Sequence, residues 1–315
     1  MAKYYERWVS SSGRPGGKEI DWLHYNEELV VQGEFLLDFD WISRGWKEEL
    51  KGMNCKKRGA PFKFPNSLIR LQAVWHQWID YREIEGITRK VVEMTKIPDF
   101  NDYSTINRRV NKLEVDFQLP KHGFVSVASD GSGIKLNEAG EYRQDKYARK
   151  KQKKYIKVTI SANPLTGDML DCDVIMEGDG PSEGEFAQKH MKRLIDNRIV
   201  IDKFWGDGLF DAKYLFNFLE RHKIEAAIKI RENACDKADG SLRRAREVAE
   251  YKSKGYKHWA RDKQYGKRWL GTEVKFSAVK RKFGEKVRSK KQENKLKEVK
   301  RRFWAYETIR LYAKA

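Results

Sequence analysis

Three acidic residues occupy positions from which their carboxylates could act together. Asp130 follows the β-like run "FVSVAS", and Asp207 ends the run "IDKFWGD". Glu273 lies in "YGKRWLGTEVKFSAVKRKFGE". If the two runs are neighbouring strands, both aspartates emerge at the same edge of a sheet. Because adjacent carboxylates repel unless a cation lies between them, this set indicates a metal site built from oxygen ligands.

Asp130 also has a purely structural explanation, and the spacing around Glu273 assigns it to a helix. Asp130 precedes two glycines in "SDGSG", where an aspartate is commonly a turn residue. Glu273 belongs to a set spaced by four, three, four and three residues, which predicts one helix face: Trp269, Glu273, Phe276, Lys280 and Phe283. We expect this face to point to the core, where an unsatisfied glutamate is costly unless a metal or a base binds it. Lys280 then lies two turns beyond Glu273, within reach of a phosphate.

Residues 1–120 show helix signals. The stretch "SLIRLQAVWHQWIDYREIEGITRKVVEMTKI" has the apolar spacing of an amphipathic helix, at Ile69, Leu71, Val74, Trp75, Trp78 and Ile79. In "IPDFNDYSTINRRVNKL" we expect a turn and then a short helix that starts at Asp102 or Ser104. Arg108 and Arg109 would lie on its exposed side and contact DNA, although such helices also occur as ordinary packing elements.

Strand patterns begin after residue 120. Runs at "FVSVAS", "YIKVTISA" and "MLDCDVIM" predict three strands joined by turns, the first ending at Asp130. A helix, the strand that ends at Asp207, a second helix and a strand over 225–230 follow, and a helix comes last. This β-β-β-α-β-α-β order predicts an α/β fold with a mixed sheet flanked by helices. We expect two domains, a helical one over 1–120 and a catalytic one over 121–315.

The charge of the chain points to a polyanion. The net charge is +19, and residues 241–315 carry 25 Lys and Arg against 8 Asp and Glu. A stretch this one-sided repels itself unless a partner such as nucleic acid neutralises it. Aromatic residues interleave with the charges there, so we expect the region to fold. The loop "YRQDKYARKKQKKYIK" is also basic, and its Lys153 and Lys154 either follow a DNA backbone or belong to a solvated hairpin loop.

Other classes of protein are not indicated. No apolar run approaches the roughly 20 residues of a membrane span, and the N-terminus has no signal-peptide core, so we expect a cytoplasmic, nucleoid-associated protein without membrane contact. The three cysteines are far apart, and the six histidines form no zinc-binding pattern.

The segments "ASDGSGIK", "WGDGLFDAKYL" and "YGKRWLGTEVKFSAVKRKFGE" together resemble the DDE transposases of bacterial and archaeal insertion sequences, in the group named after insertion sequence five. "DWLHYNEELVVQGEFLLD", "YREIEGITR" and "DYSTINRR" resemble the N-terminal half of that group. The resemblance implies a ribonuclease-H-like core in which Asp130, Asp207 and Glu273 are catalytic and bind two Mg²⁺, with Mn²⁺ able to substitute.

The same resemblance assigns DNA contacts. Tyr265, Arg268 and Lys280 match the family's Y-x2-R-x3-E-x6-K signature, with one departure: four residues rather than three separate Arg268 from Glu273. The implied function is a transposase that binds terminal inverted repeats and target DNA as a homodimer and transfers strands by in-line attack. Two alternatives stay open: a catalytically inactive DNA-binding derivative of a transposase, and a metal-dependent nuclease without strand transfer. The N-terminal domain would bind DNA ends or support dimerisation.

Overall fold

The computed structural model describes residues 21–120, 123–136, 155–237 and 239–314. These residues fall into two compact units, one built from the chain up to Asp38 with the segment from Ile309 onward, the other from Phe39–Thr308. The predicted helical region from Phe39 onward therefore lies in the same compact unit as the predicted sheet. A functional division at residue 120 stays a prediction.

The smaller unit contains one long helix and a short turn of 3₁₀ helix. Helix α2 (Trp22–Glu34) starts at Asp21, whose side chain accepts hydrogen bonds from the backbone N–H groups of the first turn. Within η1 (Phe35–Leu37), the Phe35 ring packs edge-on against Tyr312, and the Tyr312 hydroxyl donates to Asp38, the residue after η1. This hydrogen bond and ring contact link the two chain segments of the unit.

The larger unit begins with helices. They are α3 (Asp40–Asn54), α4 (Asn66–Trp75), α5 (Tyr81–Met94) and α6 (Tyr103–Lys112). The Asp102 side chain caps α6, which confirms the predicted start of this helix. The long amphipathic helix predicted across residues 67–97 is wrong, because the chain leaves the helix after Trp75 and starts a new one at Tyr81.

A five-stranded mixed sheet follows. Its strands are β1 (Phe124–Lys135), β2 (Tyr155–Ala162), β3 (Met169–Met176), β4 (Val200–Gly206) and β5 (Glu225–Ile228). The strand order is β3-β2-β1-β4-β5, with antiparallel β1–β2 and β2–β3 pairs and parallel β1–β4 and β4–β5 pairs. This arrangement confirms the predicted mixed sheet and its element order. The predicted end of the first strand at Asp130 is wrong, since β1 continues to Lys135 while paired with β2.

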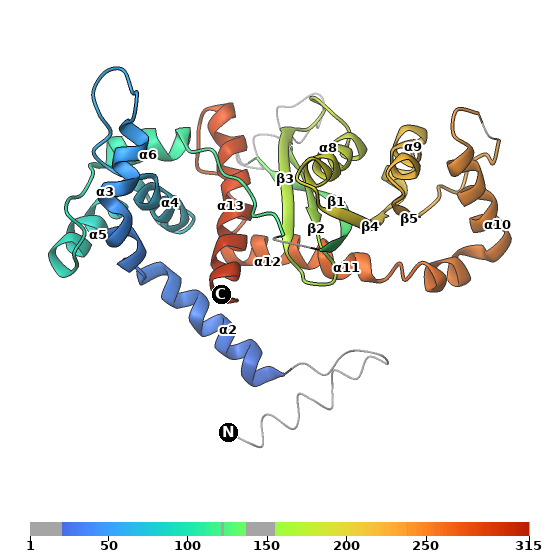
Figure 1. The fold of residues 1–315 in the computed structure, drawn as a ribbon, viewed down its shortest axis with the longest axis horizontal. Helices are drawn as coiled ribbons and strands as arrows, with labels where there is room; N and C mark the ends of the chain where they lie inside the picture. Colours follow the sequence, from blue (N-terminus) through green and yellow to red (C-terminus); the bar gives the residue numbers. More distant parts are fainter. Residues whose placement is uncertain (1–20, 121–122, 137–154, 238, 315) are drawn as a thin grey trace, which may run out of the picture. The chain divides into compact units, whose positions relative to one another are not determined.

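Helices cover both faces of the sheet (Figure 1). They are α8 (Glu183–Asp196), α9 (Lys213–Arg221), α10 (Leu242–Asp262), α11 (Lys267–Gly271), α12 (Glu273–Phe283) and α13 (Gln292–Tyr312), with η2 (Gly208–Phe210) before α9. Residues of α8 and α9 pack with Val125 and Val127 in the larger apolar cluster. On the opposite face, Ala128 packs with Trp205 and with Trp259 of α10. Alternate residues of β1 thus serve two different cores.

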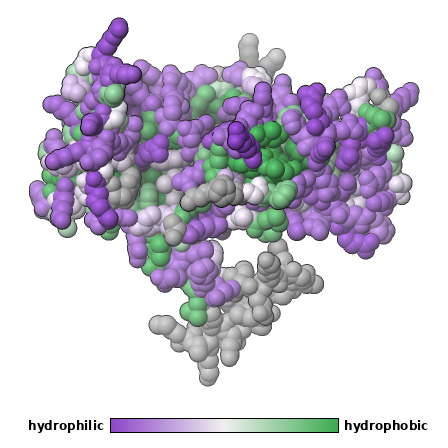
Figure 2. All heavy atoms as spheres, viewed as in Figure 1, coloured by the Kyte–Doolittle hydropathy of each residue, from purple (hydrophilic) through white to green (hydrophobic). Residues whose placement is uncertain are grey.

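Figure 2 shows that hydrophilic side chains dominate the face it draws, apart from a hydrophobic area over the sheet. Within the described ranges, no helix combines the length and the apolar character needed to cross a membrane.

A buried polar chain fastens α8 to the sheet. The Ser129 and Ser161 hydroxyls lie 2.7 Å apart, and Ser161 Oγ lies 2.8 Å from His190 Nδ1. His190 Nε2 lies 3.1 Å from Asp173 Oδ2, which also accepts from Lys189 at 2.6 Å. Burial alone would raise the pKa of Asp173, but the hydrogen bonds from His190 and Lys189 outweigh it and hold that pKa below its usual range.

We expect Asp173→Asn to destabilise the protein in a pH-dependent way. Because the folded-state pKa of Asp173 is lowered, its contribution is present above the unfolded pKa of about 3.9 and is lost as the pH falls below it. Near pH 7 the free energy of unfolding of the variant should be lower by about 1–3 kcal/mol, the range for hydrogen bonds to a charged group. Urea denaturation at a series of pH values measures the difference in free energy of unfolding between the natural chain and the variant. If this difference does not become smaller toward acid pH, the ionised Asp173 carboxylate is not what stabilises the fold.

Candidate active site

The two aspartates lie at matching positions on neighbouring parallel strands. The last pair in the β1–β4 ladder joins Ala128 to Trp205, and each aspartate follows two residues later, Asp130 in β1 and Asp207 just after β4. Beyond this point β1 pairs only with β2, so the end of β4 leaves room beside Asp130. As predicted, both aspartates lie at the edge where the β1–β4 ladder ends, and the charge of Asp207 helps to raise the pKa of Asp130.

Helix α11 closes against this edge because a glycine permits close approach. Asp130 shares the face of Ala128, on the side that α11 covers. A Cβ atom added to Gly271 would lie 3.3 Å from the Ala128 Cβ and from Pro164. Thr272 follows, completely buried, and its hydroxyl lies 3.3 Å from Asp130 Oδ2. The Gly271–Thr272 pair therefore brings the end of α11 directly onto β1 beside Asp130.

Arg268 joins two of the three acids. Its Nη1 donates to Asp130 Oδ2 at 2.8 Å, and its Nη2 donates to Glu273 Oε1 at 3.1 Å. All three side chains are at least partly enclosed, with 10% of Arg268, 13% of Asp130 and 35% of Glu273 exposed. A single guanidinium cation thus occupies the space between the carboxylates of a strand and of a following helix.

The environment of Asp130 favours a positive charge beside its carboxylate. Burial raises the pKa of Asp130, the Arg268 guanidinium lowers it, and the charge of Asp207 raises it again, with a net increase. Burial works against the charge of Arg268, but neighbouring Tyr265 and the carboxylates raise its pKa above the ordinary value. Positive charge beside Asp130 therefore offsets part of the cost of burying its ionised form.

A break between helices explains the unusual spacing of the signature. In one continuous helix, residues five apart such as Arg268 and Glu273 would not share a face. Here α11 ends at Gly271, Thr272 (φ −118°, ψ −61°) belongs to neither helix, and α12 starts at Glu273. The extra residue is absorbed at this break, so Arg268 still reaches Glu273.

The same break overturns the predicted single helix face from Trp269 to Phe283. Phe276 and Phe283 are buried, but Trp269 is 57% exposed, and Glu273 is only half-buried. The prediction that Glu273 lies on the core side of one continuous helix is therefore wrong. Glu273 instead lies at the first position of α12, facing Arg268.

The other residues of the signature lie around this centre. The Tyr265 hydroxyl donates to the backbone carbonyl of Gly206 at 3.2 Å, which fixes the strand end just before Asp207. Lys280, half-buried, donates from Nζ to the Gly133 carbonyl of β1 at 3.0 Å and lies 3.5 Å from Glu285. In this structure Tyr265 and Arg268 are buried and bonded within the protein, and their contact with DNA stays a prediction.

The other four residues predicted to contact DNA differ in their surroundings. Arg108 is exposed on α6. Arg109 is half-buried, donates to the Phe64 carbonyl and to Asn66 Oδ1 at 2.9 Å, and stacks over the Phe62 ring. Lys153 and Lys154 lie outside the described residues. Within the described part of the chain, no hydrogen bond or ion pair holds the Arg108 side chain, so Arg108 could approach DNA without losing such a contact.

A buried ion pair that the sequence reasoning missed supports Asp207. Asp211 lies four residues after Asp207, just before α9, but Ala212 occupies the N-cap position of that helix. The fully buried Asp211 carboxylate instead binds Arg244 of α10 through two hydrogen bonds, at 2.6 and 3.1 Å. Arg231 donates from its backbone to Asp211 and from its side chain to the Gly208 carbonyl. These contacts fix the turn that carries Asp207.

The donor set fits a hard divalent cation. Asp130, Asp207 and Glu273 offer only carboxylate oxygens, which Mg²⁺ and Mn²⁺ prefer. Among the described residues, no group of three acidic, histidine or cysteine side chains is already arranged around a metal position. Arg268 accounts for this, because its guanidinium stands between Asp130 and Glu273 where a cation would neutralise them.

Comparisons with known proteins agree with this arrangement. A family model described as "Transposase DDE domain" matches residues 122–307, more than half of the chain, and a second model with the same description matches residues 32–139. No curated protein matches the chain significantly.

Among solved structures, two with Mos1 transposase are similar to this chain at very low identity. The Mos1 strand transfer complex is 9% identical, with a TM-score of 0.24, and the match covers 86% of this chain and 83% of that one. The Mos1 mariner paired-end complex with Mn is 11% identical, with a TM-score of 0.22, and the match covers 100% of this chain and 93% of that one. The family model, rather than these structural similarities, assigns the family, because it spans the strand and helix positions of all three acids. The chain belongs to the DDE transposase family of polynucleotidyl transferases.

Proposed function

We propose that this transposase cleaves DNA at the ends of its element and transfers the freed strands, with Asp130, Asp207 and Glu273 as the ligands of two divalent cations. The observation that carries the proposal is the joint binding of Arg268 by Asp130 and Glu273, beside the strand end that holds Asp207. Divalent metals are the general requirement of the family, and such ions activate the attacking oxygen and stabilise the leaving one.

Each residue of the site has a distinct task. The three carboxylates would hold the cations, which would position the reacting phosphate. Tyr265 and Thr272 hold the strand ends and Asp130 in place. Lys280 lies over the extension of β1, where its ammonium can hold a phosphate of the DNA backbone.

The reaction then needs no protein nucleophile. In cleavage, a water oxygen bonds to phosphorus as the P–O3′ bond breaks, giving a 3′-hydroxyl and a 5′-phosphate. In transfer, that 3′-hydroxyl attacks a phosphate of target DNA in the same in-line manner, and the displaced strand leaves with its own 3′-hydroxyl. The DNA partners would be the terminal inverted repeats and the target, bound by a homodimer because two ends must be brought together.

Cleavage and joining of a labelled duplex that carries the element's ends tests this function. We expect nicking at the end with Mg²⁺ or Mn²⁺, and joining of a precut end into plasmid DNA. Nicking without joining would favour a nuclease, and binding without nicking in either metal would favour an inactive DNA-binding protein.

We expect Arg268→Gln to strengthen metal binding in the absence of DNA. The guanidinium competes with a cation for Asp130 and Glu273, and unit charges about 4 Å apart near a protein surface interact with about 4 kcal/mol. Part of this is offset by solvation, so we expect about tenfold tighter Mn²⁺ binding at pH 8. Titration followed by electron paramagnetic resonance measures it, with Arg246→Gln, on the exposed side of α10, as control. Unchanged or weaker binding in Arg268→Gln contradicts the competition.

A further inference from the structure

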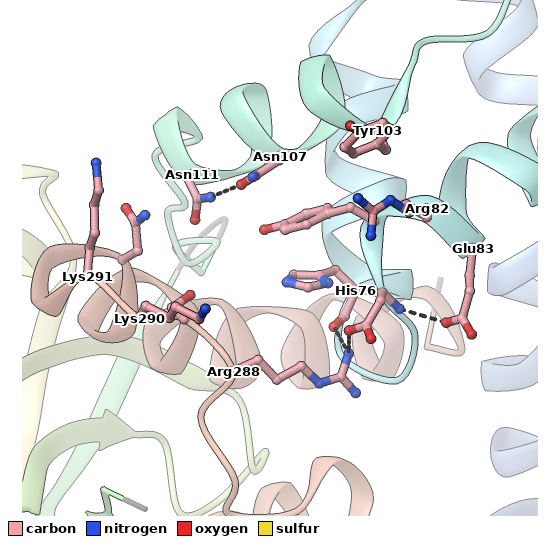
Figure 3. Close-up of a pocket in the computed structure, with 13 residues that line it drawn as sticks. His76, Arg82, Glu83, Tyr103, Asn107, Asn111, Arg288, Lys290 and Lys291 are labelled. Atoms are coloured by element: carbon pink, nitrogen blue, oxygen red, sulfur yellow. Dashed lines mark hydrogen bonds and ion pairs between the residues drawn. The ribbon is translucent and has the colours of Figure 1, made fainter. Parts of the chain in front are cut away.

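A second concave site lies away from the three acids, between the N-terminal helices and the segment that follows α12. Its volume of about 610 Å³ falls within the range of about 300–1,000 Å³ that is usual for small-molecule sites. Figure 3 shows residues of α5 and α6 on one wall, and Arg288, Lys290 and Lys291 on the other. The active-site acids are not among the lining residues.

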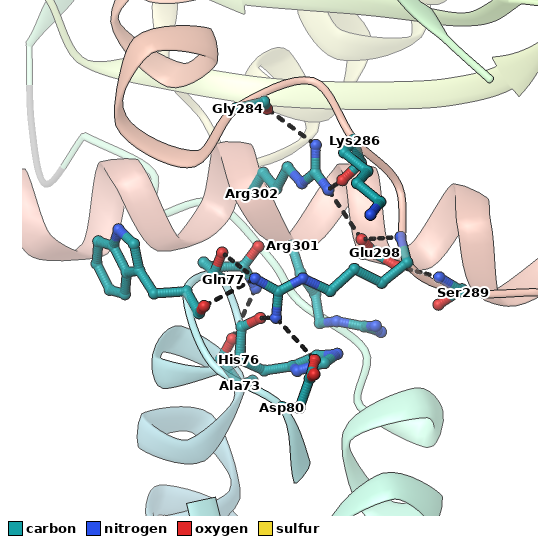
Figure 4. A network of polar contacts seen from close by, with 12 residues as sticks. Ala73, His76, Gln77, Asp80, Gly284, Lys286, Ser289, Glu298, Arg301 and Arg302 are labelled. Carbon is teal, nitrogen blue, oxygen red and sulfur yellow. Dashed lines mark hydrogen bonds and ion pairs between the residues drawn. The ribbon is translucent and has the colours of Figure 1, made fainter. Parts of the chain in front are cut away.

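Arg288 builds the second wall. Its guanidinium donates to backbone carbonyls of residues 76–79 at 2.8–3.5 Å, at the break between α4 and α5. The buried Glu298 of α13 accepts from the backbone N–H groups of Arg288 and Ser289 at 2.9 and 2.8 Å, and Arg302 binds the same carboxylate (Figure 4). The segment that presents Lys290 and Lys291 is therefore held in place before any ligand binds.

The rim of the pocket carries positive charge that is not neutralised locally. Its two carboxylates are engaged, since Asp80 binds Arg288 and Glu83 accepts from the backbone N–H of Asp80. Around Arg82, Lys290 and Lys291, no carboxylate of the described residues lies within ion-pair distance. The pocket therefore attracts an anion.

The interior offers surfaces that suit a nucleobase. The His76 and Tyr81 rings are stacked, with centroids 3.9 Å apart, and the Arg82 guanidinium lies 4.9 Å from the centroid of the Tyr103 ring. Asn107 and Asn111 add amide donors and acceptors along α6. Flat rings, amides and unpaired cations are the groups with which proteins hold unstacked nucleotides.

We infer that this pocket binds an unpaired nucleotide of the DNA, with its phosphate on Lys290 and Lys291 and its base between Tyr103 and the two asparagines. A paired base inside a duplex cannot enter a pocket of this size, whereas an unstacked one can. The inference rests on the proposed function for the identity of the polymer, because a transposase meets unpaired nucleotides at processed ends. It adds a site for them outside the catalytic centre.

The test compares two duplexes of one sequence, one blunt and one with a short single-stranded deoxyadenosine overhang. Fluorescence anisotropy is measured on the full chain in EDTA, so that cleavage plays no part. We expect the overhang to tighten binding about tenfold. Tyr103→Ala and Asn107→Ala should each remove most of this preference and leave blunt-duplex binding unchanged. Tyr214→Ala is the matched control, since Tyr214 is 41% exposed against 42% for Tyr103, and it should keep the preference.

Equal affinity for both duplexes, or a preference that survives Tyr103→Ala and Asn107→Ala in folded protein, overturns the inference. Competition by inorganic phosphate as strong as that by deoxyadenosine monophosphate also overturns it, because the pocket would then recognise phosphate without a base. The assay contains no metal, so a chain that fails to cut DNA can still pass it. A chain that cuts DNA can likewise fail it, which separates this inference from the proposed function.

Discussion

Asp207→Ala and Glu273→Ala should each lower the rate of end cleavage by at least about a thousandfold, while DNA binding stays within a few-fold of the natural chain. Each change removes a carboxylate ligand, and the loss of metal-assisted stabilisation of the reacting phosphate is worth about 4 kcal/mol or more. Single-turnover cleavage of a precleavage duplex in Mg²⁺ measures the rate, and gel retardation measures binding.

Asp179→Ala is the matched control for these variants. Asp179 is an exposed aspartate in the turn after β3, a strand that pairs with β2 and not with β1 or β4. Its removal should leave cleavage within about twofold, because surface substitutions away from special features have small effects. A cleavage rate in Glu273→Ala that matches this control would contradict the assignment of Glu273 as a metal ligand.

The second large effect is on stability. Arg244→Met should destabilise the protein by about 3–5 kcal/mol, because it leaves the fully buried Asp211 carboxylate without its ion-pair partner. At about 2–4 °C per kcal/mol for a unit of this size, the melting temperature should fall by roughly 10 °C. Thermal unfolding followed by circular dichroism measures the shift.

A double variant separates loss of the pair from loss of charge. Arg244→Met combined with Asp211→Leu removes both buried charges, and we expect it to recover most of the lost stability. If Arg244→Met alone lowers the free energy of unfolding by less than about 1 kcal/mol, the Asp211–Arg244 pair does not stabilise the turn that carries Asp207.

The element order and the two aspartates could be predicted because they depend on local patterns. Alternating apolar runs mark β2 and β3, and the glycines beside Asp130 and Asp207 mark where the β1–β4 ladder ends. The fold class followed from the order of these elements and is confirmed by the strand pairing. The extent of β1 could not be predicted, because its continuation past Asp130 depends on pairing with β2, a contact between segments distant in sequence.

The setting of Glu273 could not be predicted for a related reason. Apolar spacing across Trp269 and Phe276 resembles one continuous face, yet the close packing of Gly271 on Ala128 ends the helix there. The dipeptide "GT" before Glu273 was the available signal, since glycine followed by threonine commonly separates two helices. The bridging role of Arg268 is visible only once both helices are placed against β1.

In the basic C-terminal region, the net charge overstates the number of cations that could contact a partner. The excess of lysine and arginine pointed to a polyanion, but several of these cations are buried and bonded inside the protein. Arg301 is fully buried and donates to the Val110 carbonyl, and Arg302 is bound to Glu298. The prediction that this region folds is confirmed by its buried aromatic residues, Trp259, Tyr265, Phe303 and Trp304. Lys290 and Lys291 belong to the remainder, which faces outward.

The most direct test of the proposed catalytic site replaces a carboxylate ligand by a thiolate. Cleavage by Asp207→Cys is measured with Mg²⁺ and with Mn²⁺, because Mg²⁺ binds thiolate poorly and Mn²⁺ accepts it more readily. If Asp207 binds a metal ion, the variant should be inactive in Mg²⁺ and regain cleavage in Mn²⁺. Equal cleavage in the two metals, at the rate of the natural chain, would show that Asp207 is not a ligand and would contradict the proposed two-metal site.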